Sequence, residues 1–513
     1  MIPIEMKSNL IAVIAALLTL SACASLPENV SVVPAPGAKE INPDTHLTIT
    51  FAEKPVIGKT GFIRIYDATT NKLVDELDLS IPAGPDKSRT YGPECDYIKT
   101  PYDYTRDRMA TNKDTVPGTP SGGAAPETGK YQLTIIGGFT DGFHFHPVIV
   151  HGNTATIYPH NNLLEYGHKY YVTVDEGVLV CGDFAGITKG QWKFSTKKNG
   201  PADPANLTVD CNGNGDFNTL QGALDFVPDF AEYTTNIKIA EGDYEEIVYS
   251  RNKKNLHITG AGMDKTRIHY ENDEVFNPHP LNIKTNERRG TFPSRRAANS
   301  FDNCSDIVLE DITFETCPKG QAEGLLICGE RVALYRVHII GGGDALQSNG
   351  TVYMEDCILD GGFDAILGRG NLFAYHCKIR NTGGAVTWVR NFAPDHGDIF
   401  VECHFESTTQ RPLDFGRSRN YPNAELVLIN CTTRNVNPIG WSVMERTAHA
   451  WEFNTRDADT GEPVDFSKRN PVSRRLDAVK DAEIIANYQN PAFILKGWNP
   501  GSKRNAEQLP PVR

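Results

Sequence analysis

Three features are scarce in this sequence: long apolar runs, helical periodicity and an excess of positive charge. The apolar run Leu10–Leu20 is too short to cross a bilayer as a helix. The second half lacks helical patterns and is instead a series of strand-like segments. Acidic residues outnumber basic ones by 64 to 51, and the net charge of −13 excludes a nucleic-acid-binding role for the whole chain. The 513 residues suffice for two or three domains.

The first 23 residues have the anatomy of an export signal. Lys7 precedes the apolar run, which ends in the small residues Ser21 and Ala22 directly before Cys23. This ending resembles a bacterial lipobox, so we expect cleavage before Cys23, lipidation of that cysteine and attachment of the mature protein to a membrane. Ala24 follows instead of aspartate, which favours the outer membrane, on its periplasmic or cell-surface face. The alternative is an ordinary secretory signal and a secreted protein.

The rest of the chain divides by pattern. Residues 24–40 form a polar, proline-rich tether. Residues 41–198 contain short alternating strands between turns, which predict a β-sandwich that resembles bacterial Ig-like domains. Residues 199–206 are a linker, and residues 207–513 form a second, repetitive domain. Near its start a short amphipathic helix carries Leu220 and Leu224 on one side and is expected to plug the open end of that domain.

The second domain repeats a strand position at intervals of 25, 20, 20, 26 and 28 residues. The equivalent residues are Ile312, Val337, Cys357, Cys377, Cys403 and Cys431. Strands at such a period without helices predict a right-handed parallel β-helix. The overall fold class is therefore expected to be all-β.

Two glycine-flanked aspartates occupy equivalent points of adjacent repeats. Asp344 follows Val337 by seven residues, and Asp364 follows Cys357 by seven. Because stacked parallel strands lie about 4.8 Å apart, we expect the two carboxyl groups side by side on one face. Such a pair does not ionise independently, so one pKa should rise and the other fall. The pair would then supply one proton donor and one anionic nucleophile.

The remaining cysteines and a group of histidines have less specific interpretations. The four cysteines of the repeat position are expected to form an inward ladder of small apolar groups. One pair among Cys304, Cys317 and Cys328 could form a disulfide, and the pairing of Cys95, Cys181 and Cys211 is left open. His144, His146 and His151 are interpreted as strand residues, because no cysteine or carboxylate completes a metal-ligand set at suitable spacing. No metal or other cofactor is expected.

Short motifs follow one another in order over residues 207–500: Gly213-Asn-Gly-Asp-Phe217, Gly242-Asp-Tyr-Glu-Glu246, Gln321-Ala322, Gly343-Asp-Ala-Leu346, Asp364-Ala-Ile-Leu-Gly368, Gly416-Arg417 and Gly440-Trp441. These motifs resemble those of the pectin methylesterases, a family of right-handed β-helix enzymes. Each motif is weak alone, but together they occur in the family's order on a repeat found independently. The resemblance implies hydrolysis of methyl esters in pectin, with release of methanol.

The resemblance also implies roles for individual residues. Asp364 would be the nucleophile, Asp344 the acid and then the base, Gln321 an oxyanion donor and Arg417 the partner that orients Asp364. Substrate-binding residues would be Trp441, Trp388, Phe363, Tyr244, Arg369 and Arg419. Arginines after the aspartate pair, if they share its face, would offer a basic surface to an anionic substrate; they are Arg369, Arg380, Arg390, Arg411, Arg417 and Arg419. We expect a monomer whose partner is methylated polygalacturonate.

Departures from the family pattern leave alternatives open. Gly343 replaces a second oxyanion glutamine, for which Gln347 is a candidate substitute. Ser418-Arg419 replaces Pro-Trp, and Ala365 and Leu367 replace two phenylalanines, which would widen the groove. The alternatives are an esterase or thioesterase of the same fold with a non-pectin substrate, and a non-catalytic glycan-binding β-helix. A polysaccharide lyase is disfavoured, because it usually needs Ca²⁺ on clustered carboxylates and only a pair is present.

Overall fold

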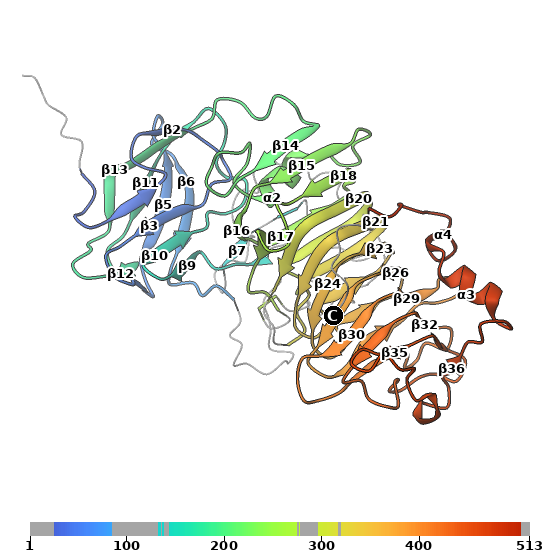
Figure 1. Cartoon of the computed structure of the whole chain (residues 1–513). Helices are drawn as coiled ribbons and strands as arrows, with labels where there is room; N and C mark the ends of the chain where they lie inside the picture. Colours follow the sequence, from blue (N-terminus) through green and yellow to red (C-terminus); the bar gives the residue numbers. More distant parts are fainter. Residues whose placement is uncertain are drawn as a thin grey trace, which may run out of the picture.

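The computed structural model joins an N-terminal β-sandwich to a long parallel β-helix (Figure 1). It describes residues 25–84, 132–134, 136–137, 143–273, 276–277, 296–316 and 320–503. The expected signal segment with Cys23, and also Cys95 and Cys317, lie outside these residues. The predicted all-β class with a parallel β-helix is confirmed. None of the helices within the described ranges is long and apolar enough to span a membrane.

Two sheets form the sandwich. The first has the order β1 (Ser31–Val33), β3 (Leu47–Thr50), β10 (Thr154–Ile157) and β9 (Val148–His151), and the second has β2 (Ala38–Ile41), β13 (Ile187–Thr196), β11 (Lys169–Val174), β5 (Phe62–Asp67) and β6 (Leu73–Asp78). Two short pairs join β12 (Leu179–Val180) to β4 (Val56–Ile57) and β7 (Leu133–Thr134) to β8 (Phe143–His144). Alternate residues of β3, β5 and β10 are buried, so both sheets enclose one apolar core.

Twenty-three strands, β14 to β36, make one continuous sheet that coils into three faces. The first face contains β17 (Val248–Arg251), β22 (Leu346–Ser348), β25 (Ile366–Gly368), β28 (Gly384–Val389) and β31 (Leu413–Arg417). The second contains β14 (Asn206–Val209), β15 (Thr235–Ile239), β18 (Lys254–Thr259), β23 (Thr351–Glu355), β26 (Asn371–Tyr375), β29 (Gly397–Val401), β32 (Glu425–Ile429), β34 (His449–Phe453) and β36 (Arg474–Arg475). The third contains β16 (Gly242–Glu245), β19 (Thr266–His269), β24 (Ile358–Gly361), β27 (Lys378–Asn381), β30 (His404–Ser407), β33 (Thr432–Arg434) and β35 (Arg456–Asp457). The long strands β20 (Asn299–Glu315) and β21 (Leu325–Ile340) bend through all three faces.

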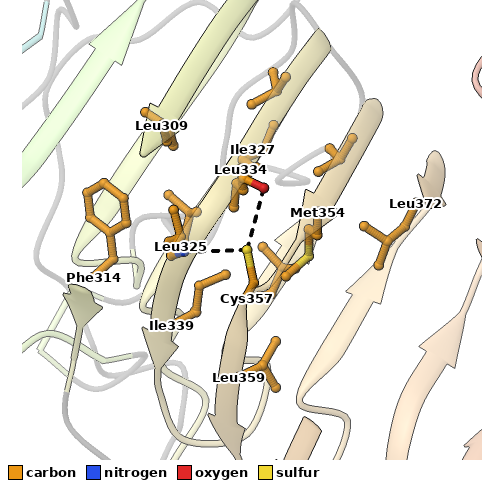
Figure 2. Close-up of a cluster of buried hydrophobic side chains, with 14 of the residues drawn as sticks. Leu309, Phe314, Leu325, Ile327, Leu334, Ile339, Met354, Cys357, Leu359 and Leu372 are labelled. Carbon is orange, nitrogen blue, oxygen red and sulfur yellow. Dashed lines mark hydrogen bonds between the residues drawn. The ribbon is translucent and has the colours of Figure 1, made fainter. Parts of the chain in front are cut away.

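Leucine, isoleucine, valine and the four repeat cysteines fill the coil. Figure 2 shows one of these cysteines, Cys357, among leucine and isoleucine side chains of the core. The predicted cysteine ladder is confirmed, because Cys357, Cys377, Cys403 and Cys431 are all buried in this core with free thiols. Each coil's thiol is within hydrogen-bonding distance of the previous coil; Cys357 Sγ, for example, lies 3.5 Å from Leu334 O. Cys304 and Cys328 are also free, so they form no disulfide with each other.

From Asp311 onward, the corner before the cysteine position is a single left-handed residue in successive coils. Its occupants are Asp311, Arg336, Asp356, His376, Glu402, Asn430 and Asn454, with φ between 51° and 58°. Only asparagine and aspartate tolerate this conformation readily, so the arginine, histidine and glutamate are strained there. Ion pairs hold some of these corners, as between Arg336 Nε and Asp311 Oδ1 at 2.7 Å. These corners could be recognised only in the structure, because the side chains that occupy them differ in charge and size.

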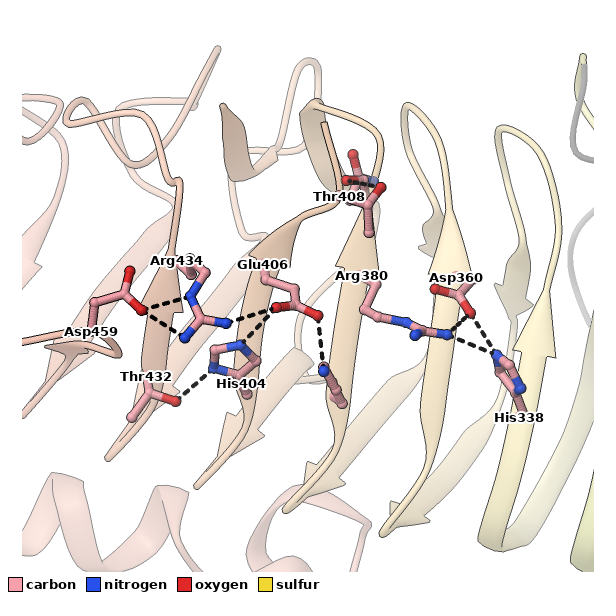
Figure 3. Close-up of polar contacts among 11 residues, drawn as sticks. His338, Asp360, Arg380, His404, Glu406, Thr408, Thr432, Arg434 and Asp459 are labelled. Atoms are coloured by element: carbon pink, nitrogen blue, oxygen red, sulfur yellow. Dashed lines mark hydrogen bonds and ion pairs between the residues drawn. The ribbon is translucent and has the colours of Figure 1, made fainter. Parts of the chain in front are cut away.

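Charged side chains line the outside of the third face (Figure 3). Asp360 Oδ2 accepts a hydrogen bond from His338 Nε2 at 2.6 Å and also pairs with Arg380. Further along, Arg434 bridges Asp459 and Glu406. Arg380 therefore belongs to an ion-pair network on a face other than the one that carries β28 and β31, which corrects its expected place in one basic surface.

The amphipathic helix α2 (Leu220–Phe226) closes the first coil, as predicted, with Leu220, Ala223 and Leu224 in the core. The start of this helix is held from both domains. Asp44 of the sandwich accepts N–H groups of Asn218 and Thr219, each at 2.8 Å. Glu246 of the β-helix accepts those of Leu220 and Gln221 at 2.8 and 2.9 Å. The first-turn donors are thus paired without water.

Asp44→Ala should lower the unfolding free energy by about 1–2 kcal/mol, because it removes this inter-domain cap. The measurement is the shift of the first thermal or urea unfolding transition. Asp183→Ala, at an exposed position of the sandwich, serves as the control. Equal transitions for the two variants would contradict the capping role of Asp44.

The histidines that drew attention in the sequence also join the two domains. His144 Nδ1 lies 2.5 Å from Phe276 O, and His151 Nε2 lies 2.9 Å from Glu245 Oε2. The ring of His146 stacks on that of Phe276 with centroids 4.6 Å apart. Among the described residues, no group of three or more histidine, cysteine or carboxylate side chains could hold a metal ion.

At the other end, the chain folds back along the second face. The helices α3 (Ala482–Tyr488) and α4 (Pro491–Ile494) follow the 3₁₀ helix η2 (Phe466–Lys468). Ile485, Tyr488 and Ile494 cover a row of outward apolar side chains that includes Tyr353 and Phe373. The second face is therefore covered.

Candidate active site

Asp344 and Asp364 lie at equivalent points of adjacent coils, in the turns that lead into β22 and β25. The register pairs Leu346 with Ile366, two residues after each aspartate. Both aspartates have left-handed backbones, with φ of 67° and 55°, a conformation that aspartate tolerates better than most residues. Their exposed fractions are only 6% and 4%. The predicted juxtaposition of two shielded carboxyl groups on one face is therefore present.

Arg417 binds Asp364 with both arms of its guanidinium. Arg417 Nε lies 2.9 Å from Asp364 Oδ1, and Arg417 Nη2 contacts Oδ2. Arg417, the last residue of β31, reaches back across the intervening β28 coil, where Trp388 is its neighbour in register. Two charge-assisted hydrogen bonds in a nearly buried pair fix the plane of the Asp364 carboxyl group.

Asp344 has the opposite environment. Burial, the largest cause, and the charges of Glu323 and Asp364 together raise its pKa to about 7, against the opposing charges of Arg296 and Arg390. Its closest cation is Arg296, whose Nη2 lies 2.9 Å from Asp344 Oδ2. Near neutral pH Asp344 is thus partly protonated and can donate a proton, beside a carboxyl group that is paired with a guanidinium.

Gln321 is on the coil before Asp344. It forms an isolated parallel bridge with Gly343 and is exposed to solvent. Its Oε1 accepts a hydrogen bond from Arg296 Nη1, so its Nε2 amide protons face away from that guanidinium. An exposed amide donor next to the acid can bind an oxyanion formed over the aspartate pair.

Aromatic side chains surround the Arg417–Asp364 pair. The Arg417 guanidinium carbon lies 4.2 Å from the Trp388 ring centroid and 5.1 Å from that of Phe363. Phe363 is 49% exposed and Trp388 is partly exposed. Tyr421 contacts Trp388 at 6.5 Å between ring centroids, so exposed rings lie beside the polar site.

Three further arginines of the predicted basic surface lie in different places. Arg369 donates from Nη2 to the Tyr421 hydroxyl at 3.2 Å and so stands at the aromatic side of the site. Arg419 is exposed in the turn after β31. Arg390 is buried behind Trp388, with its guanidinium carbon 4.8 Å from that ring. Burial and the nearby Arg369 charge lower the Arg390 pKa to about 10.

Two expected substrate-binding residues are corrected by the structure. Trp441 is completely buried and packs on Phe415 in the core, with ring centroids 5.2 Å apart, so it offers no platform to a sugar. Tyr244 is 3% exposed in the first coils, where its hydroxyl donates to Ala240 O at 3.0 Å. Tyr244 is at an inward position of β16, whereas Trp441 lies in the segment between β33 and β34 with its ring in the core of the coil.

Gln347 is also buried, at 1% exposure, and its Oε1 has no hydrogen-bond partner among the described residues. Its position on β22 is in register with Leu326 and Leu367. A side chain that is closed to solvent does not replace the missing oxyanion glutamine in this structure.

Arg296 and Glu323 are site residues that the sequence analysis missed. Arg296 contacts Asp344, Gln321 and Glu323, the last through Nε at 2.8 Å. Arg296 precedes Asp344 by 48 residues (344 − 296) in a stretch without repeats. Glu323 directly follows the matching segment Gln321-Ala322, and this was the one signal in the sequence that could have identified it.

Comparisons with known proteins were made for the whole chain. Residues 206–388 match the family model described as Pectinesterase. The curated protein Pectinesterase QRT1 of Arabidopsis thaliana is 29% identical over 286 residues, which cover 51% of this chain and 72% of the relative. Probable pectinesterase 55 of the same plant is 28% identical, over 58% of this chain and 90% of the relative. The solved pectin methylesterase from carrot is 20% identical, covering 58% of this chain and 95% of that chain, with a TM-score of 0.47.

Proposed function

We infer that this chain, whose β-helix belongs to the pectinesterase family over residues 206–388, hydrolyses the methyl esters of galacturonate units in pectin. The observation that carries the proposal is the unequal carboxyl pair. Arg417 binds both oxygens of Asp364, while burial raises the pKa of the adjacent Asp344 to about 7. Ester hydrolysis through an acyl-enzyme needs a nucleophile and a proton donor in this relation.

The first half of the reaction forms the acyl-enzyme. One Asp364 oxygen attacks the ester carbonyl carbon, and the negative charge moves to the carbonyl oxygen, where the Gln321 amide donates a hydrogen bond. When the tetrahedral intermediate collapses, the bond to the methoxy oxygen breaks. Asp344 gives its proton to that oxygen, and methanol leaves. The products are a mixed anhydride on Asp364 and an Asp344 carboxylate.

The second half returns the enzyme to its starting state. The Asp344 carboxylate takes a proton from water, and the resulting hydroxide attacks the anhydride carbonyl carbon. The bond to Asp364 breaks, which restores the Asp364 carboxylate beside Arg417 and releases the galacturonic acid carboxyl group, which then loses its remaining proton to the solvent. Asp344 is protonated again. The two half-reactions proposed here use no cofactor.

The pH dependence of kcat/KM should report the proton on Asp344. Because its pKa in the folded protein is raised to about 7, the acid is present below that pH and is lost as the pH rises through it. Activity on methylated pectin should therefore fall about tenfold per pH unit above about pH 7. Initial rates of methanol release between about pH 5 and pH 9 test this. A rate that is flat across neutral pH would contradict it.

A second candidate keeps the esterase chemistry and changes the substrate. Gly343 and the buried Gln347 leave the site with one exposed oxyanion amide, Gln321, and Glu323 adds a charge beneath the acid. A panel of methylated pectins, short acyl esters and acyl thioesters, each with wild type and Asp364→Ala, separates the two candidates. Aspartate-dependent turnover of acyl esters or thioesters without methanol release from any pectin would favour the second.

We further propose that the N-terminal sandwich is an Ig-like module and that Cys23 carries a lipid anchor at the outer membrane. The lipobox-like segment supports the anchor, and the two packed sheets support the module. Cells that express Cys23→Ala should release the protein from the membrane fraction, while wild type remains bound. Mass spectrometry of the mature N-terminus is the direct measurement; an unmodified terminus in wild type would contradict the anchor.

A further inference from the structure

One guanidinium contacts both the proton donor and the oxyanion donor of the proposed reaction. Arg296 Nη2 lies 2.9 Å from Asp344 Oδ2, and Arg296 Nη1 contacts Gln321 Oε1. The third edge of the same group, Nε, lies 2.8 Å from Glu323 Oε1. The Arg296 side chain is only 8% exposed and that of Glu323 is fully buried. Three polar partners therefore fix the plane of one rigid fork.

We infer that Arg296, anchored by Glu323, is a positioning residue that sets the orientation of both Asp344 and Gln321. The inference rests on the proposed function, because it assigns how that site is assembled. It concerns residues outside the aspartate–arginine pair that the resemblance implied.

The effect on Gln321 follows from hydrogen-bond chemistry. A primary amide can turn over and exchange its oxygen and nitrogen at little cost in water. A guanidinium has donors and no acceptor, so the amide atom facing Arg296 must be Oε1. The Nε2 donors then point the other way at every encounter with substrate. Without Arg296 about half of the amides would present oxygen to the oxyanion, and the rest would be less well held.

The effect on Asp344 is electrostatic and has two parts of opposite sign. The charged groups facing Asp344 are Arg296, Glu323, Asp364 and Arg390. Arg296 alone would favour the anion and so remove the proton that the reaction needs. Glu323 compensates for that charge on the far side of the guanidinium. The pair can thus hold the acid by a hydrogen bond and leave it protonated near neutral pH.

Substitutions that remove the charge of Glu323 or of Arg296 should shift the alkaline limb of the pH profile of kcat/KM in opposite directions. Glu323→Gln should shift the limb of kcat/KM to lower pH by about one unit, because a compensating anion is lost. Arg296→Gln should shift it to higher pH by a similar amount and lower kcat on the order of tenfold to a hundredfold, since Gln321 is no longer oriented. KM should change little, and the double variant should return the limb toward the wild-type position.

A control for lost ion-pair stability is Arg469→Gln. Arg469 pairs with Glu452 at 2.8 Å and both side chains are buried, at 5% and 2% exposure. It should reduce thermal stability without moving the limb. Circular dichroism checks that each variant is folded; if Arg296→Gln is not, Arg296→Lys and Glu323→Gln carry the test, because lysine keeps the charge and loses the fork. Arg296→Lys should then keep the limb and lower kcat.

A second readout separates failure of this inference from failure of the proposed function. The infrared carbonyl band of protonated Asp344, assigned by subtracting Asp344→Asn, is titrated in wild type and in both charge variants. If wild type releases no methanol from any pectin, the proposed function fails, and the band titration still decides the inference. The inference would be overturned if the kcat/KM limb and the carbonyl band of both variants titrated at the wild-type pH. It would also be overturned if both variants shifted in the same direction.

Discussion

Asp364→Ala is expected to abolish methanol release from methylated pectin, with a loss in kcat on the order of 10⁴-fold or more. The nucleophile has no substitute, because the adjacent carboxyl group, Asp344, is used as the proton donor to the leaving methoxy oxygen. A water molecule activated at the remaining groups would replace an intramolecular attack by a weaker bimolecular one. The measurement is methanol release from a highly methylated pectin, followed to long times with enzyme in excess.

A matched control is Asp360→Ala, four residues earlier in the chain. Asp360 is also an ion-paired aspartate, with His338 and Arg380, but it stands on the third face (Figure 3). Its loss should leave kcat within a factor of about two, since surface ion pairs contribute little to stability. Full activity of Asp364→Ala would reject the mechanism, and inactivity of Asp360→Ala would show that any lost aspartate disturbs the coil.

Arg417→Met has the second largest expected effect, on both activity and stability. It leaves the Asp364 carboxylate, whose side chain is 6% exposed, without its cation. Breaking a nearly buried pair in this way costs about 3–5 kcal/mol of folding free energy. The nucleophile would also lose its fixed plane, so kcat should fall by about 10²–10³-fold. Arg417→Lys should recover stability but only part of kcat, because an ammonium cannot bind both oxygens in the same plane.

Urea unfolding and methanol release measure the two effects separately. The control is Arg434→Met, which breaks a bidentate contact with Asp459 in the ion-pair network of the third face. That arginine is 42% exposed, so its loss should change stability by less than about 1 kcal/mol and leave activity intact. If Arg417→Met were as stable and as active as Arg434→Met, the pairing with Asp364 would have no role.

The coil and the aspartate pair could be predicted because a solenoid repeats its geometry in the sequence. The spacing from Val337 to Asp344 equals that from Cys357 to Asp364, and stacking converts equal spacing into proximity. The cysteine ladder was predictable for the same reason. Arg417 was found only through its motif, since it reaches Asp364 across the intervening β28 coil.

Features that depend on side-chain direction or on irregular segments could not be predicted. Trp441 and Tyr244 matched motifs, but each ring points into the core. Arg296 reaches the acid from a segment with no partner in the repeat, so no periodicity marks it. The left-handed corners were hidden because residues as unlike as His376 and Glu402 adopt the same backbone there. Family motifs identify positions and leave orientation to the surrounding packing.

The contacts of Asp44 with Asn218 and Thr219 at the start of α2 bear on how this enzyme can be engineered. A shortened chain beginning at residue 206 would retain the aspartate pair and Arg417. It would also expose the N–H groups of Asn218 and Thr219, which now donate to Asp44 in the removed sandwich. The sandwich therefore helps to close the first coil of the β-helix that carries the proposed active site. If the β-helix is fused to another domain, that domain should provide a different hydrogen-bond acceptor for these N–H groups.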